Sequence, residues 1–206
     1  NFLYVDGTGK ISSHSTASDF SIFPAGDYTD FVATGTGTFE FIGKGNLSNR
    51  SNYNNLNFRS EGASIDIPAI DLNLQGNLTI LSGNLSNVVY NRSISLSGNW
   101  RDYVVNGFIP GTGSVVFDGI AAQNITINTS ETFYDFEIDN ASNLTLLSPV
   151  DVSNSLILTL GKIITDPFNI LTLTNKNNNI SLFIYSMLIS KQLPDWQDYQ
   201  IYLKIN

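Results

Sequence analysis

The 206-residue sequence has no cysteine, a single histidine and few basic residues. The lack of cysteine excludes disulfides, thiol catalysis and thiolate metal sites, and one histidine excludes histidine-rich metal sites. Ten lysines and arginines stand against 18 aspartates and glutamates, which gives a formal net charge of −8. Because ten basic side chains can neutralise only a small number of phosphate groups, we expect no nucleic-acid partner and no binding to an anionic membrane surface.

Long hydrophobic runs are also missing. The longest mostly apolar run, residues 182–189, has eight residues, whereas a helix that crosses a bilayer needs about 20. We therefore expect no membrane insertion. The sequence begins with Asn1, and no basic segment precedes an apolar stretch. We expect no intact signal peptide here and a sequence that is part of a longer or processed chain.

Uncharged polar residues that alternate with apolar ones are abundant instead. Alternation is clear in residues 38–42, 93–97 and 171–174. This period of two, with Val, Ile, Phe and Thr bounded by Gly and Asn, is typical of short, half-buried strands. Runs with helical spacing are scarce. The sequence predicts an all-β fold.

Four segments recur in the same order roughly 76 to 80 residues later. The matching pairs are 36–43 with 112–119, 53–58 with 133–138, 70–72 with 150–152, and 94–97 with 171–174. Because the order is kept, an internal duplication explains the matches better than shared composition does. The resulting division is one or more incomplete N-terminal coils or a cap at 1–35, a first solenoid unit at 36–111, a second unit at 112–175, and a divergent C-terminal cap or tail at 176–206.

The spacing of the predicted strands favours a parallel β-helix, also called a β-solenoid. Eight strand centres lie about 15 to 22 residues apart, which suits one strand per coil and about eight coils. An antiparallel β-sandwich is the alternative, although its turn signals usually recur every 8 to 12 residues. The residues expected to point inward are Leu72, Leu74, Ile94, Leu96, Val116, Phe136, Ile138, Leu156, Leu158, Leu171 and Leu173.

Several of these phrases resemble repeats in large secreted or cell-surface proteins of Bacteroidetes. The segments that carry the resemblance are 36–43, 98–100, 110–119, 122–125 and 133–140, and it covers about residues 20 to 175. It implies an adhesin- or autotransporter-like parallel β-helix, exported by the type IX secretion route to the cell surface or the medium. The sorting domain that such proteins often carry is not matched by residues 176–206. The resemblance supplies no catalytic residues.

Carboxylates are the main candidates for chemistry. Glu131, Asp135, Glu137 and Asp139 fall close together, and the last three would share one face of a strand. Two such acids could serve as acid and as base or nucleophile in polysaccharide cleavage, and Asp135, Glu137 and Asp139 could hold a hard cation weakly. A solvated strand face without chemistry is the interpretation that we favour. We expect no catalytic residues, no metal site and no cofactor.

The remaining candidates have ordinary structural explanations. His14 is expected to be a surface-loop histidine rather than part of a catalytic triad, which only geometry could define. Asp71 and Asp151 recur at matching places, which favours a structural task such as capping a turn. A group of aromatic residues could stack on sugars but more commonly would fill the core; these are Tyr53, Trp100, Tyr103, Phe133 and Tyr134.

These observations lead to one expected function and one alternative. We expect a non-enzymatic structural or adhesive β-helical segment of an exported bacterial surface protein. Its partners would be surface glycans or other cell-surface proteins. The alternative is a carbohydrate-active β-helix that binds or cleaves polysaccharides with the acids around residues 131–139.

Overall fold

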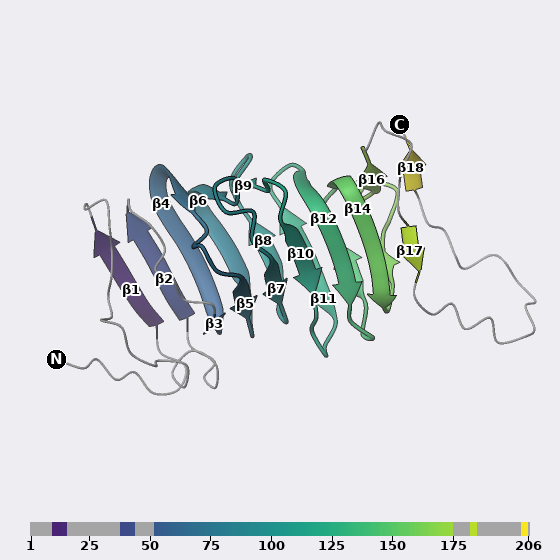
Figure 1. Cartoon of the computed structure of the whole chain (residues 1–206), viewed down its shortest axis with the longest axis horizontal. Helices are drawn as coiled ribbons and strands as arrows, with labels where there is room; N and C mark the ends of the chain where they lie inside the picture. Colours follow the sequence, from purple (N-terminus) through teal and green to yellow (C-terminus); the bar gives the residue numbers. More distant parts are fainter. Residues whose placement is uncertain (1–9, 16–37, 44–51, 175–181, 185–202, 206) are drawn as a thin grey trace, which may run out of the picture.

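The computed structural model describes residues 10–15, 38–43, 52–174, 182–184 and 203–205. These residues form strands and turns and contain no helix, so the all-β prediction is confirmed. All strand pairings among them are parallel. The strands stack along one axis, as Figure 1 shows. The parallel β-solenoid is therefore confirmed, and the antiparallel sandwich is wrong.

The described strands form two sheets. Sheet 1 contains, in spatial order, β1 (Lys10–Ser15), β2 (Thr38–Gly43), β4 (Asn55–Asp66), β6 (Leu78–Ser86), β8 (Trp100–Asp102), β11 (Gln123–Ile127), β13 (Leu144–Leu146) and β15 (Ile163–Ile164), and β9 (Phe108–Ile109) pairs with β6. Sheet 2 contains β18 (Leu203–Ile205), β16 (Leu171–Leu173), β14 (Val150–Leu160), β12 (Glu131–Asp139), β10 (Ser114–Phe117), β7 (Ile94–Leu96), β5 (Leu72–Leu74) and β3 (Asn52–Tyr53), and β17 (Leu182–Ile184) pairs with β14.

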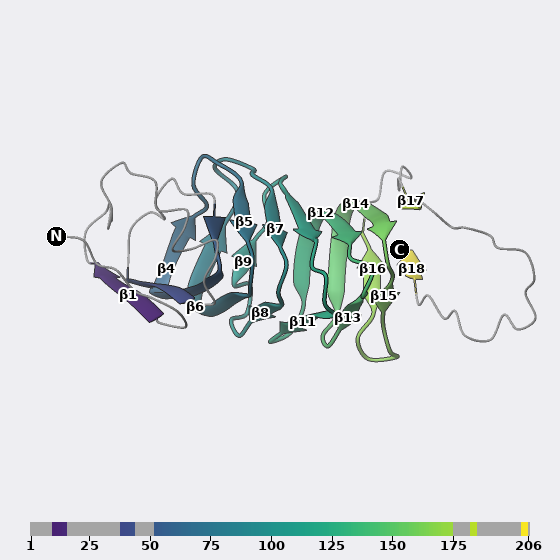
Figure 2. The ribbon, with the colours of Figure 1, turned by 90° about the horizontal axis from the view of Figure 1, so that it is seen from below.

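From β2 to β16, each turn of the solenoid passes through both sheets. In Figure 2, strands of sheet 1 such as β8 and β11 line one side, and strands of sheet 2 such as β7 and β12 line the other. Hydrogen-bonded residues on neighbouring turns are typically 20 to 25 positions apart. The described part of the chain makes about six turns, not eight, because successive predicted strands, such as those centred near residues 57 and 73, belong to the two sheets of one turn.

Two of the longer strands bend where glycine allows it. β4 and β6 bend at Gly62 and Gly83, which have φ angles of +81° and +73°, a region that residues with a Cβ rarely adopt. Beyond the bends, Ile65 aligns with Leu85, and Leu85 aligns with Phe108 of β9. These short segments form a third row that links sheet 1 to sheet 2.

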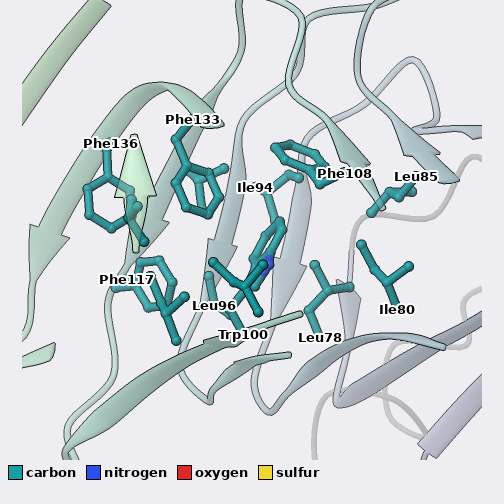
Figure 3. Close-up of a cluster of buried hydrophobic side chains, with 14 of the residues drawn as sticks. Leu78, Ile80, Leu85, Ile94, Leu96, Trp100, Phe108, Phe117, Phe133 and Phe136 are labelled. Atoms are coloured by element: carbon teal, nitrogen blue, oxygen red, sulfur yellow. The ribbon is translucent and has the colours of Figure 1, made fainter. Parts of the chain in front are cut away.

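Aligned apolar side chains fill the interior. Leu72, Ile94 and Val115 stand in register on β5, β7 and β10, and all three are buried. Figure 3 shows the central cluster, in which the Trp100 ring lies 5.0 Å from the Phe108 ring and 5.1 Å from the Phe133 ring, measured between centroids, in edge-on contacts. Such aromatic contacts add to the burial of apolar area, which is the main stabilising contribution of a solenoid core.

The predicted inward residues are buried, with two exceptions. Val116 is half-buried on the outer side of β10, whereas Val115 and Phe117 are the buried residues of that strand. The prediction was wrong there because β10 has apolar residues on both faces, so alternation alone could not assign the inner one. Leu158 is partly buried and packs against the core.

Asparagine side chains connect successive turns at the corner between sheet 2 and sheet 1. Asn55 Oδ1 accepts a hydrogen bond from the Asn77 backbone N–H at 2.8 Å, and Asn77 Oδ1 accepts one from the Asn99 N–H at 2.8 Å. Asn99 Oδ1 accepts the next, from the Asn124 N–H at 2.7 Å. Each bond satisfies a backbone donor that the sheets leave unpaired at a corner. We call Asn55, Asn77, Asn99 and Asn124 the asparagine ladder.

The predicted duplication relates places that are only partly equivalent. β5 and β14 both lie in sheet 2, as do β7 and β16, but β2 lies in sheet 1 and its match β10 in sheet 2. Segment 176–206 is described only at β17 and β18, which continue sheet 2 by pairing with β14 and β16. Segment 1–35 is described only at β1, which pairs with β2. The rest of both predicted caps lies outside the described residues.

Candidate functional site

The four acids singled out in the sequence do not form one group. They all lie on β12, but the burial pattern of that strand places Glu131 on the inner face, where it is 3% exposed. Asp135, Glu137 and Asp139 lie on the outer face. Glu131 therefore cannot combine with the other three as the two carboxylates of a surface glycosidase site would.

Two of the outer acids are tied to the next turn by hydrogen bonds. Asp135 Oδ1 accepts hydrogen bonds from the Asn154 side-chain amide, at 2.6 Å, and from the Ser155 hydroxyl. Glu137 Oε1 accepts one from the Thr159 hydroxyl at 2.6 Å. Within the described ranges, no three His, Asp or Glu side chains come together as a group that could hold a metal ion. These contacts join β12 to β14.

The inner acid Glu131 faces a second buried acid, Asp102, at the end of β8. Both positions stand in register with apolar residues of the adjoining turns. Asp102 stands in register between Ile80 of β6 and Ile127 of β11. Glu131 stands in register with Val150 of β14. Asp102 is 0% exposed. The carboxyl groups of Asp102 and Glu131, which we call the carboxyl pair, thus replace apolar side chains at one corner of the solenoid.

The corner formed by residues 103–107 folds over Asp102. Asp102 Oδ1 accepts a hydrogen bond from the Val104 N–H at 2.8 Å, and the Phe108 N–H also donates to this carboxylate. Gly107 lies directly against it, since a Cβ at that position would be 2.2 Å from Asp102 Oδ1. Only a glycine leaves room for the carboxylate there.

Burial and mutual contact change the ionisation of the carboxyl pair. Burial, followed by the hydrogen bond and the charge of Asp102, raises the pKa of Glu131 to about 10. Burial also raises the pKa of Asp102, although hydrogen bonds from Glu131, Val104 and Phe108 oppose that shift. Glu131 is therefore protonated at neutral pH and can donate its proton to Asp102.

The indole of Trp100 is the other polar group at the carboxyl pair. It lies beside the Glu131 carboxyl group and favours the ionised form, but less strongly than burial opposes it. The contact is looser than a standard hydrogen bond, because Trp100 Nε1 has no partner within hydrogen-bond geometry. Asp102 Oδ2 and Glu131 Oε2 are likewise buried without a donor among the described residues.

Sequence reasoning missed Asp102 altogether and assigned Glu131 to the wrong group. The signal that could have identified both is the true repeat of the solenoid. Aligning Ile80, Asp102 and Ile127 requires steps of 22 and 25 residues, and the unequal steps conceal the column. Once the column is aligned, an acid between two isoleucines is conspicuous.

The other sequence candidates have structural places. His14 lies within strand β1, not in a loop. Asp71 Oδ1 accepts a hydrogen bond from the Ser93 N–H on the next turn at 3.0 Å, which confirms a structural task. Asp151 lies inside β14, so it does not cap a turn. Of the aromatic candidates, Tyr53, Trp100 and Phe133 are buried, Tyr134 is half-buried and Tyr103 is exposed.

Comparisons with known proteins found no match, so a function has to be inferred from the geometry of the chain. None of the described segments forms a helix long and apolar enough to cross a membrane. No family model matches the chain, and neither a curated protein nor a solved structure matches it.

Proposed function

We propose that this chain is a non-enzymatic structural or adhesive β-helical segment of an exported bacterial surface protein. The observation that carries the proposal is the way in which polar side chains are used. The asparagine ladder, Asp71, Asp135 and Glu137 all bond to a neighbouring turn. Side chains committed in this way stiffen a rod, and they are poorly placed to exchange protons with a substrate.

The shape of the molecule supports the same proposal. A parallel solenoid extends along one axis, and each turn contacts mainly its neighbours. Successive turns therefore present the same outer faces again and again, which suits a stalk or an adhesive surface for glycans or for other cell-surface proteins. The formal net charge of −8 favours partners other than nucleic acid or anionic lipid.

Polysaccharide cleavage is the function to be tested against this one. The experiment incubates the wild type and Glu137→Gln with a panel of acidic and neutral polysaccharides and measures new reducing ends. We expect no cleavage by either protein. Cleavage by the wild type that is lost in Glu137→Gln would contradict the proposal and support a carbohydrate-active enzyme.

Adhesion is tested separately by binding. The wild type is applied to arrays of surface glycans and to immobilised bacterial cell-surface proteins. We expect binding without turnover of the bound partner. A chain that binds neither class, and that is not part of a longer surface protein, would contradict both the structural and the adhesive role.

A further inference from the structure

The carboxyl pair is not explained by the packing of the core. Every aligned neighbour of Asp102 and Glu131 in register is apolar: Ile80 and Ile127 on either side of Asp102, and Val150 beside Glu131. An apolar residue at either position would fill the column without the free-energy cost of removing a carboxyl group from water. Two carboxyl groups in contact at one corner indicate a task beyond filling space.

Among the residues that the structure describes, no cation interacts with the carboxyl pair. The inward side chains from the elements packed around it are Ile80 of β6, Phe108 of β9, Ile127 of β11 and Val150 of β14, and none of them titrates. On β8 itself, Arg101 lies between two buried residues and so points to the outer face. Throughout the described chain, the buried charged side chains are all acids. The positive charge that the carboxyl pair needs is therefore a proton.

The hydrogen-bond donors around the carboxyl pair indicate how that proton is used. Asp102 receives the N–H groups of Val104 and Phe108, which suits an ionised carboxylate. Asp102 Oδ2 and Glu131 Oε2 remain without a donor. A proton on Glu131, donated to Asp102, satisfies both atoms, because a protonated carboxyl group is one donor and an ionised one is only an acceptor.

We propose that Asp102 and Glu131 share one proton, and that this proton acts as a latch holding the corner 103–107 on the solenoid. Ionised Asp102 binds the corner through Val104 and Phe108, and protonated Glu131 holds Asp102 in place from the next turn. Loss of the proton puts two negative charges in contact in the core, which drives the carboxylates apart and frees the corner. The inference does not rest on the proposed function.

Release of the latch would free the corner 103–107, which lies at the surface of the molecule. The corner carries Tyr103 and Val105, whose side chains are 52% and 54% exposed. Gly107 allows the corner to approach Asp102 this closely, since a Cβ at position 107 would lie 2.2 Å from Asp102 Oδ1 and 2.3 Å from Asp102 Oδ2. When the Asp102 carboxylate moves, its bonds to Val104 and Phe108 are lost, whereas the bonds from the Tyr103 N–H to the Ile80 carbonyl oxygen and from the Leu85 N–H to the Gly107 carbonyl oxygen do not involve that carboxylate and remain. The latch therefore acts locally.

The direction of the pH dependence follows from the raised pKa of Glu131. Its pKa is about 10 in the folded chain, against 4.5 as an ordinary value. Between these values the folded state holds a proton that the unfolded state has released. The free energy of unfolding therefore falls as the pH rises through this window, and the contribution of Glu131 is fully present only below the lower value. The raised pKa of Asp102 acts in the same direction.

The test compares the wild type with Glu131→Gln, which keeps the shape and a donor but has no proton to lose. Glu137→Gln, on the outer face of the same strand, is the matched control. Urea unfolding is measured from about pH 5 to about pH 9. We expect the urea midpoint of the wild type and of Glu137→Gln to fall over this range, and Glu131→Gln to lose at least about half of that fall. Asp102→Asn, which gives Glu131 an amide donor, provides a second variant should Glu131→Gln not fold.

Two further measurements separate a shared proton from a latch. Infrared difference spectra at neutral pH should contain a protonated carboxyl band that is absent in Glu131→Gln. Amide exchange at Val104 and Phe108 should be at least about tenfold faster in the wild type than in Glu131→Gln at about pH 9, and similar in the two at about pH 5. Equal pH slopes in the two proteins, or no such band, would overturn the shared proton. Unchanged exchange ratios across the pH range would overturn the latch.

Discussion

At the scale of single residues, the two faces of a strand have opposite requirements. Leu96 is fully buried between Leu74 and Phe117, whereas Ser95 on the same strand is half-buried on the outer face. Leu96→Asp places an unpaired charge in an apolar column and should lower the free energy of unfolding by about 4 kcal/mol, whereas Ser95→Asp should lower it by less than about 1 kcal/mol. Urea unfolding measures both. Similar midpoints for the two variants would show that the faces are assigned wrongly.

Replacing the carboxyl pair by apolar residues should have the opposite effect on stability to placing a charge in the core. The double variant Asp102→Ile with Glu131→Val restores the residue types of the adjoining turns. Because buried carboxyl groups cost desolvation, we expect the free energy of unfolding at neutral pH to stay the same or to rise by about 1–4 kcal/mol. Exchange at the Val104 and Phe108 amides should nevertheless become faster, since their acceptor is gone. A loss of more than about 2 kcal/mol would mean that the carboxyl pair is chiefly a stabilising element.

Residue-level prediction from the sequence succeeded where the pattern was unambiguous. Leu72, Leu74 and Ile138 alternate with polar neighbours, and all three are buried. The prediction for Val116 was wrong because β10 has apolar side chains on both faces, and the hydrophobic period alone does not show which of them points inward. Asp102 was missed for a different reason. A buried acid contradicts the rule by which inward residues are recognised, so only the alignment of turns reveals it.

At the scale of elements, the corners decide how strands stack. At the repeated pairs Gly76-Asn77 and Gly98-Asn99, the backbones of successive turns lie so close together that only glycine fits. A Cβ on Gly98 would lie 2.3 Å from the Gly76 carbonyl carbon. The ladder bond from Asn99 to the Asn124 N–H persists across a turn of 25 residues, where the other ladder steps span 22. The corner is therefore held constant while the loops beside it vary in length.

The asparagine ladder can be tested at its middle position. Asn77 bonds in both directions, since its backbone N–H and its side-chain Nδ2 donate to Asn55 Oδ1, and its own Oδ1 accepts from the Asn99 N–H. Asn77→Ala leaves the Asn99 N–H without its acceptor and should cost about 1–3 kcal/mol. Asn57→Ala, on the outer face of β4, should cost less than about 1 kcal/mol. Thermal or urea unfolding distinguishes the two variants. Equal losses in the free energy of unfolding would show that the asparagine ladder does not stabilise the fold.

The number of turns also depended on the corners. Predicted strands were counted one per coil, but a turn contributes a strand to each of two sheets, as β4 and β5 do. Unequal loops conceal the period further, because the insertion before Gln123 lengthens one turn. There the Gln123 amide fills the gap by donating to the Leu96 carbonyl oxygen at 2.9 Å. A sequence pattern predicts strands well, but it assigns them to sheets only when loop lengths are regular.

At the scale of the whole molecule, stability depends on contacts between neighbouring turns. Such a chain approximates a sum of turns and interfaces, so damage at one turn spreads only to the next. The carboxyl pair and the asparagine ladder both fit this scheme, because each joins adjacent turns only. The fold class was predictable from the sequence because each turn repeats one local pattern. The carboxyl pair was not predictable in this way because it occurs at a single corner.

The C-terminal strands provide the last prediction. β17 pairs with β14, and β18 pairs with β16, both in parallel register at the end of sheet 2. Deleting residues 176–206 should expose the backbone edges of β14 and β16, and exposed edges pair readily with other chains. We expect the truncated chain to self-associate in analytical ultracentrifugation and to unfold at lower urea concentration, while the full chain under the same conditions associates less. A truncated chain that stays monomeric and equally stable would show that these strands do not protect the end of the solenoid.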